Sequence, residues 1–268
     1  MKVILTILLL GFSISFYSQG NCLIYPEGSG ERKACELSYK AIEETQGSKE
    51  SQLIFDAAIA AGSKYAWAYY EKSVPYLKRG FLHEGLQILN EAVKLEPLNY
   101  LPYRAYWYWQ YRNYSLCIQD LKEYYSLPKA YIQFTPGGEK DMRIILGLAY
   151  AKMNNYEKAI QTIENCINSY KSEDDFGLAD YHTLGIIYLH SKQYDKAIVA
   201  FEKQFTIYDK IADSYFFLGL AYKGKSDFEK ANINFNKALL VFEDNTRYSN
   251  PNSGFRVYKS DVEREIIK

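Results

Sequence analysis

Apolar side chains recur at helical spacing along most of this chain, in paired segments separated by short polar turns. Two stretches, residues 178–211 and 212–245, align without a gap over 34 residues. In each stretch, positions 4, 7, 8 and 11 share one face of a helix, and positions 17, 20, 24 and 27 share one face of a second helix. The pattern predicts a hairpin of two helices, which has no core until a neighbouring hairpin covers it.

Small and aromatic residues recur at fixed points in both stretches. A Leu-Gly pair is followed in order by Tyr, a second aromatic residue, Ala and Phe; these are Leu184, Gly185, Tyr188, Tyr194, Ala197 and Phe201, then Leu218, Gly219, Tyr222, Phe228, Ala231 and Phe235. This order resembles the 34-residue signature of the tetratricopeptide repeat (TPR) family. The resemblance implies an all-α fold, a right-handed α-solenoid of about five to six helical hairpins that ends in a capping helix.

The same register locates further copies of the repeat. The expected repeats cover residues 32–65, 66–99, 98–131, 140–173, 178–211 and 212–245, and residues 246–268 have the composition of a C-terminal cap. From residue 66 onward, successive starts are 32, 42, 38 and 34 residues apart, so two insertions interrupt the array. They fall at residues 128–139 and 171–177 and are expected to be loops between hairpins. Pro75 is expected to kink the first helix of its repeat.

The N-terminus has the pattern of an export signal. Residues 1–20 combine Lys2, an apolar run that is too short to span a membrane, and a small-x-small triplet. We expect cleavage near Gly20, no membrane insertion afterwards, and a short loop over residues 21–31. Export to the periplasm or the medium would let Cys22 and Cys35 form a disulfide. The less favoured alternative is lipidation of Cys22 in an outer-membrane lipoprotein, but the preceding residues do not resemble a lipobox.

Charge balance argues against nucleic acid as a partner. The chain has 32 Lys and Arg against 32 Asp and Glu, whereas phosphate binding requires a basic surplus on one face. Aromatic content is high, at 16% with 27 Tyr, which fits aromatic side chains at recurring structural positions.

Three features resemble catalytic or metal-binding motifs. Residues 219–226 match the P-loop pattern, but here they are expected in a helix and the turn after it, rather than between a strand and a helix. The histidines (His83, His182 and His190) lack metal-ligand spacing, and Cys117 and Cys166 occupy small-residue positions expected to be buried. We therefore expect no catalytic residue, no metal site and no cofactor.

The family resemblance also implies a concave groove lined by the first helix of each hairpin. Its expected peptide-binding residues are apolar or aromatic for the most part: Tyr70, Val74, Tyr106, Trp109, Ile144, Leu148, His182, Ile186, Phe216 and Leu220. The Lys and Asn that clamp a terminal carboxylate in some TPR proteins do not occur at the corresponding positions. An equally weighted alternative is that these side chains pack against the adjacent repeat, or that the C-terminal tail fills the groove.

The leading functional hypothesis is a non-enzymatic interaction scaffold that binds a protein or peptide segment in this groove. The alternative is a structural or assembly subunit of a cell-envelope complex that acts through its convex face or the 128–139 loop.

Overall fold

The computed structural model describes residues 21–172, 175–244, 246–248 and 254–266, so the expected signal at residues 1–20 lies outside the described part of the chain. The described residues form thirteen α-helices and one short 3-10 helix, and their β structure is a single bridge between Phe134 and Asp141. None of these helices has the length and apolar character needed to cross a membrane. The predicted all-α repeat fold is confirmed.

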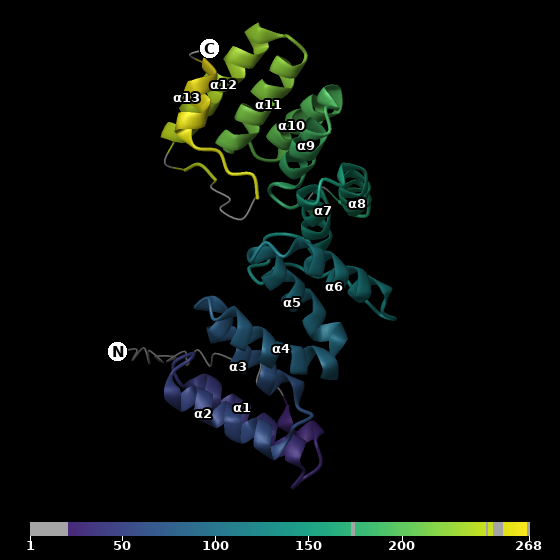
Figure 1. The fold of residues 1–268 in the computed structure, drawn as a ribbon, viewed down its shortest axis with the longest axis vertical. Helices are drawn as coiled ribbons and strands as arrows, with labels where there is room; N and C mark the ends of the chain where they lie inside the picture. Colours follow the sequence, from purple (N-terminus) through teal and green to yellow (C-terminus); the bar gives the residue numbers. More distant parts are fainter. Residues whose placement is uncertain (1–20, 173–174, 245, 249–253, 267–268) are drawn as a thin grey trace, which may run out of the picture. The chain divides into compact units, whose positions relative to one another are not determined.

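The helices belong to two compact units, which are described separately (Figure 1). Unit 1 extends to Leu95 and contains η1 (Cys22–Ile24), α1 (Gly30–Glu43), α2 (Lys49–Ala61), α3 (Ala66–Lys78) and α4 (Leu82–Leu95). Unit 2 begins at Glu96 and contains α5 (Pro97–Gln110), α6 (Tyr114–Ser126), α7 (Met142–Lys152), α8 (Tyr156–Asn168), α9 (Asp180–His190), α10 (Tyr194–Ile207), α11 (Ala212–Gly224), α12 (Phe228–Glu243) and α13 (Lys259–Ile266). Successive helices up to α12 form antiparallel hairpins.

Side-chain caps fix the start of many of these helices. Ser29 and Ser48 cap α1 and α2 by accepting hydrogen bonds from the backbone N–H groups of Arg32 and Ser51. The first N–H groups of a helix have no partner within it, so each cap satisfies a donor that would otherwise be left unpaired. Asn113, Asn155 and Asp227 cap α6, α8 and α12, the second helices of three hairpins in unit 2, in the same way.

A left-handed residue closes the turn inside each of five hairpins. Gly80, Arg112, Asn154, Lys192 and Ser226 all have φ between 59° and 88°. Their separations of 32, 42, 38 and 34 residues equal the steps read from the sequence between repeat starts. The extra residues in the two longer steps therefore lie between hairpins, at the connections from α6 to α7 and from α8 to α9.

Glycine allows the two helices of a hairpin to approach closely. A Cβ atom at Gly219 would lie 2.5 Å from the ring of Phe235, and one at Gly185 would lie 2.8 Å from the ring of Phe201. Both rings belong to the continuous core of unit 2. This is the physical reason why the Leu-Gly and Phe positions recur together along the sequence.

Unit 1 has a smaller core of its own, centred on Phe55, Ala34 and Cys35. Cys22 and Cys35 are joined by a disulfide, which connects η1 to α1. In α3, the helix continues past Pro75 to Lys78, and Pro75 is buried.

Candidate functional site

The structure buries most of the side chains that were expected to line a groove. Tyr70 and Val74 lie in unit 1, and the other eight lie in unit 2. The side chains of Val74, Trp109, Ile144, Leu148, His182, Ile186 and Phe216 are buried, whereas those of Tyr70, Tyr106 and Leu220 are half-buried. Their role in binding a peptide stays a prediction. Burial leaves little of their surface available in this conformation.

His182 shows how such a position is buried between repeats. Its ring lies between Phe201 and Phe217, and its Nδ1 is 2.8 Å from the hydroxyl oxygen of Ser214 on α11. Its backbone N–H donates to the side-chain oxygen of Gln204, also buried. Burial, and to a smaller extent the charge of Lys140, lowers the pKa of His182 to about 3. The imidazole is therefore neutral at pH 7 and structural.

This burial predicts a loss of stability in acid. Because the pKa of His182 is lower in the folded chain than in the unfolded chain, its stabilising effect is complete above pH 6.5 and is lost as pH falls toward 3. Relative to a His182→Gln variant, the native chain should lose about 2 to 3 kcal/mol between pH 7.5 and pH 4.5. Urea titrations of both proteins at the two pH values measure this difference, and an unchanged difference would contradict the assignment.

A different set of side chains on the first helices is in contact with the C-terminal part of the chain. We call α5, α7, α9 and α11 together the first-helix face, and residues 254–258 the tail segment. Lys152, the last residue of α7, donates from Nζ to the carbonyl oxygen of Gly254 and lies 3.6 Å from the ring centroid of Phe255. The ring of His190, the last residue of α9, lies 5.0 Å from the same Phe255 ring. The tail segment thus contacts two successive first helices.

The tail segment continues to α11 and ends in a buried anchor. The backbone N–H of Val257 donates to the carboxylate of Asp213 at 3.3 Å, and Val257 itself is buried in the core of unit 2. Desolvation raises the pKa of Asp213 to about 6, although the hydrogen bond from Val257 and, to a smaller extent, the charges of Arg247 and Arg256 oppose the rise. Beyond the segment, α13 packs on α12 and buries Val262. The tail segment therefore covers part of the first-helix face.

Lys152 and His190 are not among the groove residues predicted from the sequence. Each is the last residue of its helix, beyond the predicted Leu148 on α7 and Ile186 on α9. The sequence shows only that Lys152 and His190 fall at the ends of corresponding helices. No local pattern predicts their contact with Phe255.

The residues that resemble catalytic motifs lie in a helix, in the turn after it and in the buried core. Gly219 lies in the middle of α11, Gly224 ends that helix, and Lys225 pairs with Asp195 on α10. Cys117 and Cys166 are buried, and burial raises the pKa of both thiols to about 12. In the described part of the chain, no three His, Cys, Asp or Glu side chains are grouped so that they could hold a metal ion.

Comparison with known proteins identifies the repeat. Residues 141–173, 181–210 and 212–245 match the family model described as tetratricopeptide repeat. These matches fall on the hairpins α7–α8, α9–α10 and α11–α12 of unit 2. None of the curated proteins is similar enough to count as a match.

Solved structures of similar fold extend over more of the chain. MamA is 24% identical with a TM-score of 0.54, covering 64% of this chain and 94% of its own. YrrB, described as a TPR protein with an unusual peptide-binding site, is 18% identical with a TM-score of 0.56, covering 71% of this chain and 93% of its own. PilF of Pseudomonas aeruginosa is 12% identical with a TM-score of 0.59, covering 80% and 93%. At these identities the likeness concerns the fold alone.

Proposed function

Because residues 141–245 make this chain a member of the tetratricopeptide repeat family, we propose that it is a non-enzymatic scaffold which binds a segment of another protein on the first-helix face of unit 2. The partner segment would replace residues 254–258 at the ends of α7 and α9. YrrB, a protein of similar fold, is described as having a peptide-binding site, which is consistent with this class of function.

One observation carries the proposal: the first-helix face already holds a short non-helical stretch of polypeptide. Lys152 contacts a backbone carbonyl oxygen and the Phe255 ring of this stretch. Asp213 accepts a hydrogen bond from the backbone N–H of Val257, whose aliphatic side chain is buried. Backbone contacts of this kind do not depend on the sequence of the bound segment. The ring contact of Phe255 and the burial of Val257 do depend on it, so we expect a partner segment with an aromatic residue followed two positions later by an aliphatic one.

We also propose that the protein is exported to the periplasm or the medium. The Cys22–Cys35 disulfide supports this location, because disulfides persist in oxidising compartments and are rare in the cytosol.

Site-specific photo-cross-linking tests the binding face. The photoreactive residue p-benzoylphenylalanine replaces His190, which is exposed beside Phe255, in cells that make the protein. The matched control places it at Ile233 on α12, which is also exposed. We expect a protein adduct from position 190 and none from position 233. A companion Phe255→Ala change removes the ring contact with Lys152. This weakens binding of the tail segment to the first-helix face by about 1 kcal/mol, so the adduct yield should increase about fivefold.

Adducts from both positions in equal yield would contradict the proposal, and so would their absence at position 190. A yield at position 190 that falls in the Phe255→Ala variant would show that the tail segment is part of the binding surface rather than its occupant, which also overturns the proposal.

A further inference from the structure

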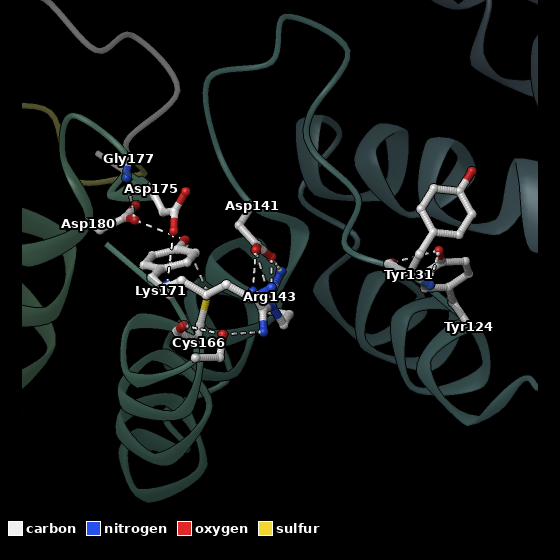
Figure 2. Close-up of polar contacts among 11 residues, drawn as sticks. Tyr124, Tyr131, Asp141, Arg143, Cys166, Lys171, Asp175, Gly177 and Asp180 are labelled. Carbon is white, nitrogen blue, oxygen red and sulfur yellow. Dashed lines mark hydrogen bonds and ion pairs between the residues drawn. The ribbon is translucent and has the colours of Figure 1, made fainter. Parts of the chain in front are cut away.

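The first of the two insertions forms an ordered loop over residues 127–141. The hydroxyl group of Tyr124 donates to the carbonyl oxygen of Tyr131 at 2.8 Å and accepts from its N–H at 3.1 Å, which fixes the loop to α6 (Figure 2). Further along, the N–H of Thr135 donates to the carbonyl oxygen of Lys140 at 2.8 Å, and the bridge between Phe134 and Asp141 closes the turn. The loop is therefore held at both ends.

Despite this order, the first loop leaves large apolar side chains in solvent. Ile132 is 48% exposed and Phe134 is 49% exposed. Exposed apolar side chains on a well-fixed backbone mark a contact surface more specifically than the same side chains on a mobile loop, because little ordering entropy is lost on binding.

The second insertion forms a loop over residues 169–179, of which 173 and 174 lie outside the described part. Asp175 accepts hydrogen bonds from the backbone N–H groups of Lys171 and Ser172 at 2.9 and 3.0 Å. At the other end, the carboxylate of Asp180 accepts from the N–H of Gly177 at 2.8 Å and from the hydroxyl group of Tyr170 at 3.1 Å. The loop is thus closed on itself at Asp175 and held to the start of α9 at Asp180 (Figure 2).

Arg143 joins the two loops. Its guanidinium forms hydrogen bonds to both carboxylate oxygens of Asp141, the last residue of the first loop, at 2.6 to 3.1 Å. The same group donates to the hydroxyl oxygen of Ser169, the first residue of the second loop, at 2.8 Å, and lies 5.9 Å from the Tyr170 ring centroid. Asp141 is buried, and its ion pair with Arg143 compensates its charge.

Between the loops lies a cavity of about 520 Å³, which we call the two-loop pocket. Its apolar walls come from both insertions: Ile132, Phe134, Tyr170 and Phe176. Its charged walls are Glu139, Asp141, Lys171 and Asp175. The volume falls within the range of small-ligand pockets, about 300 to 1,000 Å³, and is sufficient for two adjacent side chains of a partner.

The charges around the pocket favour a cationic occupant. With Asp141 compensated by Arg143, the remaining charges are Glu139 and Asp175 against Lys171, an excess of one negative charge. Glu139 is exposed, and no ion pair to it is seen in the described residues. Arginine is suited to such a site, because its guanidinium stacks on aromatic rings and pairs with carboxylates.

We propose that the two-loop pocket is a second protein-binding site, which takes a segment of a partner protein with an aliphatic side chain next to an arginine. The aliphatic side chain lies against Ile132, Phe134 and Phe176, and the arginine lies over an aromatic ring beside Glu139. This site is separate from the tail segment and does not depend on the function proposed above.

Defined peptide pools test the proposal on the full chain. Three pools of labelled twelve-residue peptides share random flanks and carry a fixed central pair: Leu-Arg, Leu-Glu or Ser-Arg. Fluorescence anisotropy measures the affinity of each pool. We expect the Leu-Arg pool to bind about tenfold more tightly than the other two, and the difference from Leu-Glu to shrink as salt is raised.

Two pocket variants and two control variants assign the binding to the pocket. Phe134→Ser changes an exposed side chain and should weaken binding of the Leu-Arg pool about fivefold. Glu139→Lys reverses the excess charge and should transfer the preference to the Leu-Glu pool, whereas Glu202→Lys, on the exposed side of α10, should leave it unchanged. Lys152→Glu changes only the first-helix face and should also have no effect, which separates this test from that of the proposed function.

Equal binding of the three pools would overturn the proposal. So would a Leu-Arg preference that persists in Glu139→Lys, or one that disappears in Lys152→Glu.

Discussion

Replacing Arg104 by methionine is expected to lower the free energy of unfolding of unit 2 by about 3 to 5 kcal/mol. Arg104 on α5 forms two hydrogen bonds of 2.8 Å to the carboxylate of Asp120 on α6. The Asp120 side chain is 3% exposed, so loss of its partner leaves a buried carboxylate without compensation. Urea denaturation followed by fluorescence of Trp107 and Trp109, which lie on α5, measures the change.

Asp120 supplies the control for this prediction. Burial raises its pKa even with Arg104 in place, so in the Arg104→Met variant the carboxyl should become protonated at still higher pH. The cost of the substitution should therefore decrease as pH falls, because the neutral acid needs no counter-charge. The double variant Arg104→Met/Asp120→Leu should recover most of the lost stability at pH 7. A double variant as unstable as the single one would show that packing, not charge, explains the loss.

The second large effect is expected from removal of the Cys22–Cys35 disulfide. A double variant with Cys22→Ser and Cys35→Ala should reduce the stability of unit 1 by about 3 kcal/mol, since the disulfide closes a loop over a separation of 13 residues. Alanine is chosen at position 35 because that side chain is buried. Hydrogen exchange measured by mass spectrometry should show faster exchange in α1 and α2, with α9 to α12 unchanged.

Reduction of the native protein provides an independent comparison. Treatment with dithiothreitol should reproduce the exchange pattern of the double variant and leave the variant itself unaffected. A native chain that exchanges alike with and without reductant would mean that the disulfide does not stabilise unit 1.

The repeats could be read from the sequence because their determinants are local. Gly185 and Phe201, or Gly219 and Phe235, lie 16 residues apart within one hairpin, so the contact recurs with the repeat and is visible as a pattern. The two insertions were visible for the same reason, as departures from a constant step.

The sequence did not show what the insertions and the tail contact. Lys152 and Gly254 are 102 residues apart, and nothing periodic connects them. The pocket likewise depends on Arg143 reaching Ser169, 26 residues away, which brings two separately irregular loops together. Burial of Ile144, Leu148 and Ile186 also follows from packing between neighbouring repeats, which a helical pattern cannot distinguish from exposure in a groove.

The course of the tail segment also bears on how unit 2 unfolds. In a repeat array each hairpin contacts its immediate neighbours, so the ends can fray while the middle stays folded. Here Gly254 lies beside Trp109 on α5 as well as Lys152 on α7, Phe255 contacts α9, and Val257 is bound to α11. A single stretch of chain thus links four hairpins that would otherwise be coupled only in sequence, and it makes their unfolding more concerted than nearest-neighbour contacts alone would allow.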